Sequence, residues 1–319
     1  MKWAYRLRTL SIFVILTLFM MLIGFVIGWF FGYGLYGLTI MLVVSVIMSF
    51  CSYWFSKESA LRANRVHIIT REENPRLYGI VEKVAKEAGL PMPQVGICEA
   101  NMPNAFATGR NPDNAAVVAT TGILRVLNDD ELEAVFGHEM SHVKNRDILV
   151  MSVASCMVAI LTYASRMLYW GALFSGGNRD SRENAVLLVI AALCIIFVPI
   201  AGLILQLAVS RNREYLADET GARITGKPRE LANALLKLER GCAAPDNDYT
   251  DTAHANMWIS EPCRKGFAKN LFSTHPSTED RVRKLEALAE AMDEGQVKAY
   301  TPEEDSSKSV MKSKTMTSR

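Results

Sequence analysis

The sequence lacks the features that mark several common classes of protein. Its six cysteines, at positions 51, 98, 156, 194, 242 and 263, include no CxxC pair, and we assign them no metal or redox chemistry. Its 35 Lys and Arg against 33 Asp and Glu leave a net charge of +2, and the basic residues form no stripe. Nothing therefore indicates a nucleic-acid partner.

Charge is almost missing from four long stretches, which are Leu10 to Phe30, Leu35 to Phe55, Ile148 to about Trp170, and Ala185 to Val209. About 20 apolar residues suffice to cross a bilayer. Arg166 lies near one end of the third stretch, where its side chain can reach the lipid headgroups. The first stretch is too long for the roughly 7–15-residue apolar region of a signal peptide. The alternative is that these stretches are core helices of a water-soluble protein, but such helices are rarely so long without a charged residue. We therefore predict an integral membrane protein with four transmembrane helices.

Lys and Arg are distributed unequally around these spans. They lie before the first span, between the second and the third, and after the fourth. These residues are Lys2, Arg6, Arg8, Lys57, Arg62, Arg65, Lys144, Arg146, Arg211 and Arg213. The linker 31–34 has none, and the two arginines of the loop between spans three and four are interleaved with acidic residues. Because positively charged segments stay in the cytoplasm, we predict that both termini and both large polar segments are cytoplasmic.

The spans divide the chain into five parts. Residues 1–56 and 148–209 form two membrane hairpins, and residues 57–147 and 210–292 form two parts of one cytoplasmic domain. The tail 293–319 is rich in Ser, Lys and Glu and has no periodic apolar residues, so we expect it to be disordered.

The first polar segment mixes helix and strand patterns. Apolar periodicity over 74–90 predicts a helix, and residues 94–100, 104–109 and 115–124 are typical of short strands. A further helix is expected to begin at Asn128 or Asp129, with acidic residues in its first turn. The predicted fold is mostly α, with a cytoplasmic α+β domain that contains a small sheet.

This last helix carries the sequence AVFGHEMSH, residues 134–142. His138 and His142 are four residues apart, so they lie one turn apart on the same helix face and can bind one ion. Glu139 flanks that face and can take a proton from water on the metal, as in the HExxH arrangement of zinc proteases. The alternative is a coincidental pair on a solvated helix face.

A catalytic zinc site needs a third protein ligand and an open position. His142 precedes span three by six residues, and Glu214 follows span four by five. At about 1.5 Å per helical residue, both stand roughly 8–9 Å beyond the span ends, on the same side of the membrane. We therefore predict Glu214 as the third ligand, although it would otherwise be an ordinary polar residue on a helix leaving the membrane.

Asp218 lies four residues after Glu214, on the same helix face. Histidine ligands usually donate their other N–H to a carboxylate, which fixes their orientation. We predict this supporting role for Asp218, the alternative being a surface aspartate paired with an arginine. Glu219 points about 100° away on a helix and is not chosen.

Four motifs occur in a recognisable order: PNAFATG (103–109), GHEMSH (137–142), REYLAD (213–218) and THPSTEDR (274–281). Together with the apolar hairpins, they resemble the HtpX-type membrane zinc endopeptidases, which are gluzincins with a zincin-like domain, related to the CAAX prenyl proteases. The resemblance extends over about residues 1–290, and the tail has no counterpart in it. It implies one zinc ion per chain, held by His138, His142 and Glu214, with Glu139 as general base and then acid.

The resemblance implies further site residues. Asn104, Ala105, Phe106 and Ala107 resemble an edge strand along which a substrate backbone lies by β-addition, although they could equally form an ordinary core strand. His275 and Arg281 match a His-Pro…Arg element that could stabilise an oxyanion. The alternative for His275 is a residue near the N-cap of the following helix.

The resemblance implies that the protein hydrolyses misfolded or damaged membrane proteins, as part of quality control in the stress response. It also implies a place in a bacterial inner membrane, in contact with the lipid bilayer, and membrane-proximal polypeptides as substrates. Two other functions stay open. A CAAX-type prenyl protease shares the catalytic residues but has more spans. A non-catalytic scaffold with a structural zinc would usually have four protein ligands, and His67 and His254 have no partner at metal spacing.

Overall fold

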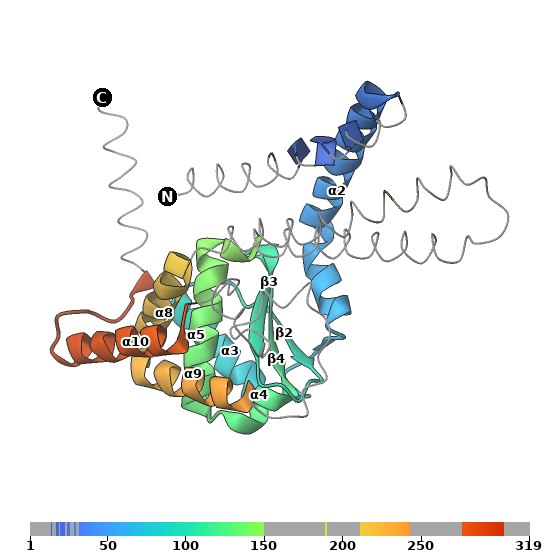
Figure 1. Cartoon of the computed structure of the whole chain (residues 1–319). Coiled ribbons are helices and arrows are strands. Elements are labelled where there is room, and N and C mark those ends of the chain that lie inside the picture. Colours follow the sequence, from blue (N-terminus) through green and yellow to red (C-terminus); the bar gives the residue numbers. More distant parts are fainter. Residues whose placement is uncertain are drawn as a thin grey trace, which may run out of the picture.

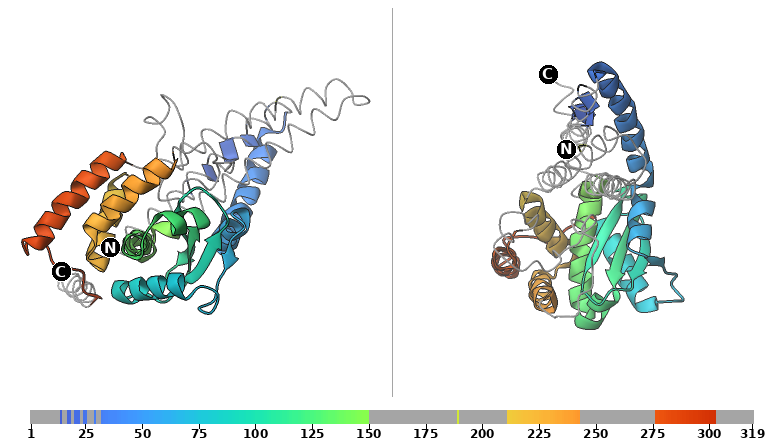
Figure 2. Two further views of the ribbon diagram at one scale, coloured as in Figure 1. Left: turned by 90° about the horizontal axis from the view of Figure 1, so that it is seen from below. Right: turned by 45° about the vertical axis from the view of Figure 1, so that its right-hand side comes forward.

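The computed structural model of the protein describes residues 32–149, 211–242 and 276–302, together with scattered positions between 14 and 29 and at 189. The described residues form one body of helices and a small sheet, from which a long N-terminal helix projects (Figures 1 and 2). This agrees with the prediction of a mostly helical chain that contains a small sheet.

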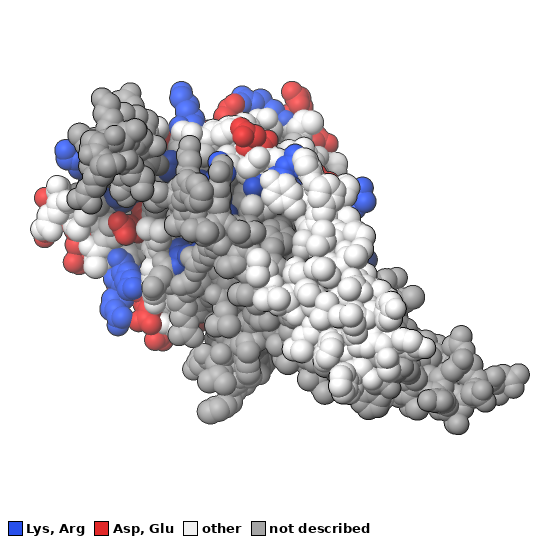
Figure 3. Space-filling model, turned by 90° about the horizontal axis from the view of Figure 1, so that it is seen from above, with Lys and Arg blue, Asp and Glu red and all other residues white. Residues whose placement is uncertain are grey.

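The projecting helix is α2 (Gly34–Ala63). Its residues 34–51 are long and apolar enough to cross a membrane, and large side chains such as Leu35, Ile40 and Phe50 are exposed along it. Figure 3 shows a broad surface free of charged side chains on this side of the molecule. Among the described residues α2 is the one candidate span, and it coincides with the second predicted span. The third and fourth predicted spans lie almost wholly outside the described residues, and only scattered positions of the first are described, so all three stay predictions.

The sheet is mixed and has four strands, β1 (His67–Ile68), β2 (Gln94–Cys98), β3 (Ala105–Asn111) and β4 (Asn114–Thr120), in the order β1-β2-β4-β3. Strand β4 is antiparallel to β3 and parallel to β2. The prediction of a strand as far as residue 124 was wrong. The Thr120 hydroxyl accepts a hydrogen bond from the amide of Ile123 and so begins helix α4 (Thr121–Val126).

Five longer helices complete the body, namely α3 (Pro75–Ala88), α5 (Asp129–Asn145), α8 (Arg211–Thr225), α9 (Pro228–Cys242) and α10 (Thr278–Asp293). Asn128 caps α5 and forms a capping box with Glu131. Every residue of α5 from Glu131 to Val143 is buried. A helix that is buried all round lies in the centre of its domain, and Figure 1 shows α5 between the sheet and α8, α9 and α10.

The two faces of the sheet pack against different helices. Ala105, Ala107 and Val117 belong to the main core, which α3 and α5 share. Phe106 and Val118 point to the other face and form a smaller cluster with Ala60 of α2. This alternation follows from the two-residue period of a strand, and it places β3 between α5 and α2.

The start of the C-terminal tail lies against the body, whereas the tail was expected to be disordered. The amide of Tyr300 donates to the carbonyl of Arg223 at 2.8 Å. The Lys144 ammonium group lies 4.5 Å from the centre of the Tyr300 ring and also donates to the Tyr300 hydroxyl. Residues 294–302 therefore join the end of α10 to α8 and α5, and the remainder of the tail lies outside the described residues.

Candidate metal centre

Helix α5 presents two histidines to the same point in the core. The Nε2 atoms of His138 and His142 are 3.2 Å apart, and both side chains are buried. Their four-residue spacing gives this arrangement on any regular helix.

Helix α8 brings a carboxylate to the same point. The oxygens of Glu214 lie 3.5 Å from His142 Nε2 and 3.8 Å from His138 Nε2, and the ligand atoms of the three residues all lie within 4.8 Å of one another. Ligand atoms held about 2.0–2.1 Å from a tetrahedral ion are about 3.3–3.4 Å apart. Two imidazoles and a carboxylate with these separations fit a single metal ion.

The spacing of the two ligand helices depends on two glycines. Gly137 of α5 and Gly221 of α8 face each other where the helices cross. A Cβ atom on Gly221 would lie 2.5 Å from the backbone nitrogen of His138 and 2.6 Å from the carbonyl carbon of Gly137. Backbone atoms of a buried helix cannot move aside cheaply, so only glycine allows α8 to approach this closely.

Replacing Gly221 with alanine is therefore expected to push α8 away from α5. We expect the free energy of unfolding to fall by about 1–3 kcal/mol and the bound metal to decrease, because Glu214 moves with α8. Thermal unfolding and metal analysis of the detergent-purified variant measure both effects. The matched control is Gly79→Ala in α3, where an added Cβ meets nothing within 4 Å. Unchanged stability and metal content in Gly221→Ala would show that the glycine contact does not set the helix spacing.

A carboxylate–arginine pair stands behind His138. Its Nδ1 lies 2.9 Å from Oδ1 of Asp218, and Arg281 of α10 donates two hydrogen bonds to Asp218 at 2.7 and 2.8 Å. Burial alone would raise the pKa of Asp218, but the charge of Arg281 holds it below the usual value. An ionised Asp218 only accepts hydrogen bonds, so the proton of a neutral His138 is expected on Nδ1, with the Nε2 lone pair toward His142 and Glu214.

A second such pair, not predicted from the sequence, stands behind His142. Asp147 Oδ2 lies 3.4 Å from Nδ1 of His142, and Asp147 Oδ1 lies 3.1 Å from a guanidinium nitrogen of Arg213. Burial lowers the pKa of His142, but Asp147 and Glu214 outweigh burial and raise it to about 9. These surroundings favour positive charge beside His142, which a bound dication would supply.

Glu139 lies beside the ligands and is 3 % exposed. Burial raises its pKa to about 8, against the opposing effects of His142 and of a hydrogen bond from the backbone of Ala107. A carboxylate with a pKa near neutrality is suited to accept a proton and to return it. The contact with Ala107 also places strand β3 next to Glu139.

The remaining predicted site residues fall in three places. Ala105, Phe106 and Ala107 are the first residues of β3, Asn104 directly precedes them, and all four are buried. Strand β3 lies at one edge of the described sheet. Arg281 contacts Asp218, lies 3.5 Å from His138 Nδ1 and lies 3.9 Å from Glu214. These contacts support a role in holding the ligands, and an oxyanion role for Arg281 stays a prediction. His275 lies outside the described residues.

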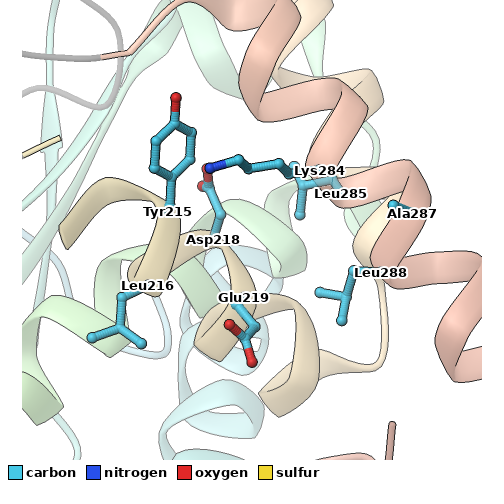
Figure 4. Close-up of a pocket in the computed structure, with 8 residues that line it drawn as sticks. All are labelled: Tyr215, Leu216, Asp218, Glu219, Lys284, Leu285, Ala287 and Leu288. Atoms are coloured by element: carbon cyan, nitrogen blue, oxygen red, sulfur yellow. The ribbon is translucent and has the colours of Figure 1, made fainter. Parts of the chain in front are cut away.

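A groove of about 520 Å³ lies between α8 and α10 (Figure 4). Its lining residues are Tyr215, Leu216, Asp218, Glu219, Lys284, Leu285, Ala287 and Leu288. The ammonium group of Lys284 lies 3.2 Å from the centre of the Tyr215 ring. Neither Glu139 nor either histidine ligand lines this groove. We therefore do not assign it to the peptide substrate.

An HExxH helix completed by a glutamate from a later helix is the ligand set of a metallopeptidase. The model of the family described as peptidase family M48 matches residues 71–289. "Protease HtpX homolog" from Thermococcus sibiricus is 43% identical over 287 residues, which cover 90% of this chain and 97% of the relative. The protein of that name from Thermococcus kodakarensis is 44% identical over 286 residues, with the same two coverages.

The protein named "Protease HtpX homolog" from Syntrophobacter fumaroxidans is 40% identical and covers 89% of this chain and 99% of the relative. The crystal structure of S. mikatae Ste24p has 16% sequence identity and a TM-score of 0.48, over 89% of this chain and 66% of that one. The chain belongs to peptidase family M48, among its HtpX-type members. It is a metalloprotease, and its substrates are polypeptides.

Proposed function

We propose that this protein is a zinc endopeptidase of the cell membrane that cleaves cytoplasmic, membrane-proximal segments of misfolded or damaged membrane proteins. The observation that carries the proposal is the convergence of His138, His142 and Glu214 at one buried point, with Glu139 beside them. One zinc ion per chain would be held by the three ligands. Imidazole and carboxylate also accept other divalent ions, so zinc is proposed for its common use with this ligand set.

Zinc held by these three residues would polarise the scissile carbonyl and lower the pKa of the attacking water. Glu139 takes the proton from the attacking water and passes it to the nitrogen of the leaving amine. Asp218 and Arg281 hold His138 in the tautomer whose Nε2 binds the metal. Strand β3 would hold the substrate backbone extended along Asn104–Ala107, because Ala107 contacts the carboxylate of Glu139.

The position of α2 supports action close to a bilayer. The 21 apolar-rich residues from Leu35 to Phe55 correspond to about 30 Å of helix, which matches the hydrocarbon thickness. Trp54 therefore falls at the membrane surface, where tryptophan is favoured. Arg110, at the far end of β3, lies 4.4 Å from the centre of the Trp54 ring. The strand that passes Glu139 would thus end at headgroup level.

The test compares one cleavable sequence in two settings, with the full-length protein reconstituted in liposomes. In one substrate the sequence follows a transmembrane anchor, within a few residues of the bilayer. In the other the same sequence is in a soluble protein. We expect zinc-dependent cleavage of both, stopped by a chelator, with the anchored substrate cleaved faster. Equal rates would contradict the membrane-proximal preference, and efficient cleavage of a prenylated C-terminal peptide alone would favour the CAAX-protease alternative.

A further inference from the structure

The second carboxylate–arginine pair, Asp147 with Arg213, connects the two helices that carry the metal ligands. Asp147 follows the end of α5, and Arg213 directly precedes Glu214 in α8. Asp147 contacts both the Nδ1 atom of His142, at 3.4 Å, and Arg213, at 3.1 Å. Asp147 is 4 % and Arg213 is 8 % exposed. The Asp147 carboxylate therefore contacts one proposed metal ligand, His142, and also Arg213, the neighbour in sequence of another proposed ligand, Glu214.

The chain conformation at the end of α5 is what directs Asp147 back toward the helix. Arg146 is the C-cap and has a left-handed conformation, with a φ of 59°. A left-handed residue commonly ends a helix in this way. Few residues other than glycine adopt a positive φ without cost. The turn places the carboxylate of Asp147 beside the last ligand of α5.

The arrangement repeats the contacts around the first histidine. His138 has Asp218 behind its Nδ1 atom, and Asp218 is held by Arg281. His142 has Asp147 in the equivalent position, and Asp147 is held by Arg213. The two arginines come from different helices, Arg281 from α10 and Arg213 from α8. Each imidazole thus has its own buried carboxylate with an arginine partner.

We infer that Asp147 and Arg213 are positioning residues for the metal centre: Asp147 orients the imidazole of His142, and Arg213 acts through Asp147. This inference rests on the proposed metal-dependent function. Carboxylates behind histidine ligands fix the tautomer and raise the basicity of the ligand, and their loss typically weakens metal binding about 10–100-fold. The competing explanation is an ion pair that only connects α5 to α8 and has no effect on the metal.

The test measures the zinc dissociation constant of the full-length protein in detergent, by competition with a chelator, for Asp147→Asn, Arg213→Met and the double variant. We expect Asp147→Asn to bind zinc at least about 10-fold more weakly. Because Arg213 acts through Asp147, Arg213→Met should add little once Asp147 is replaced. Asp147→Asn leaves the charge of Arg213 buried without its carboxylate partner, which can destabilise the fold. The double variant removes both charges, and it tests the role of Asp147 if the single variant does not fold.

Matched controls come from the exposed pair Arg76–Asp129, at 2.5 Å, whose aspartate lies at the other end of α5. Asp129→Asn and Arg76→Met make the same chemical changes away from the metal, and both should bind zinc as the wild type does. A second measurement is the visible absorption spectrum of the protein saturated with cobalt(II), which reports the ligand geometry. We expect the spectrum to change in Asp147→Asn and in the double variant, and to be unchanged in both controls. A purely structural ion pair would leave the spectrum of the saturated site unaltered.

The outcomes separate this inference from the proposed function. Wild-type zinc affinity and an unaltered cobalt spectrum in Asp147→Asn or the double variant, in a chain whose wild type binds zinc, would overturn the inference alone. Additive effects of Asp147→Asn and Arg213→Met on zinc affinity would overturn the role of Arg213 through Asp147. A wild-type chain that binds no metal would overturn the proposed function and this inference with it.

Discussion

Replacing Glu139 with glutamine is expected to abolish peptide hydrolysis and to leave metal binding intact. Glutamine has nearly the same size and shape, but its amide cannot accept the proton of the attacking water. General-base catalysis contributes about 10²–10⁴-fold to a rate, so kcat/KM should fall by at least about 10²-fold. The three ligand side chains are unchanged, and the variant should therefore hold the same amount of zinc as the wild type.

The variant is also expected to fold. Glu139 is buried, and its pKa is raised to about 8, chiefly by burial, so removing its ionisable group removes a group that is costly to charge inside the protein. The measurements are the initial rate of cleavage and the zinc content of the same preparation. Cleavage at the wild-type rate by a zinc-loaded Glu139→Gln protein would exclude Glu139 as the base.

Replacing Glu214 with alanine is expected to remove the metal itself. Glu214 is completely buried, and its oxygens lie 3.5 and 3.8 Å from the two histidine Nε2 atoms. Loss of a direct ligand should weaken zinc binding by more than the roughly 100-fold upper limit seen for residues that only orient a ligand. Activity should disappear together with the metal, in contrast to Glu139→Gln, which loses activity alone.

The control for this variant is Glu219→Ala, on the same helix. The Glu219 side chain is 54% exposed and lies 3.8 Å from Arg223, away from the metal ligands. Exposed ion pairs of this kind contribute little to stability, so Glu219→Ala should retain zinc, activity and unfolding temperature. A Glu214→Ala protein that keeps one zinc per chain would require a different third ligand.

The sequence predicted those parts of the site that depend on regular helix geometry. His138 and His142 are one turn apart in α5, and Glu214 and Asp218 are one turn apart in α8. Any helix presents such pairs on one face, whatever surrounds it. The structure brings His138, His142 and Glu214 together at one buried point, with the buried Asp218 behind His138, and their roles remain predictions for the experiments above.

The sequence could not predict the parts of the site that depend on tertiary contacts or on the end of a helix. Asp147 follows His142 by five residues, which is not a helical spacing, and its contact with the imidazole comes just after the left-handed residue Arg146, where the helix ends. The contact between Gly137 and Gly221 joins residues 84 positions apart, and no local pattern indicates it. The tail was expected to be disordered from its composition, yet Tyr300 has specific partners on α5 and α8.

The central claim is that one zinc ion is held by two imidazoles and one carboxylate. X-ray absorption at the zinc K-edge, measured on the full-length wild-type protein purified in detergent, tests this claim most directly. We predict one zinc per chain, with a first shell of nitrogen and oxygen at about 2.0–2.1 Å, two imidazoles and no sulfur. A sulfur shell at about 2.3 Å, which would require a cysteine ligand, or a chain that contains no zinc, would contradict the account.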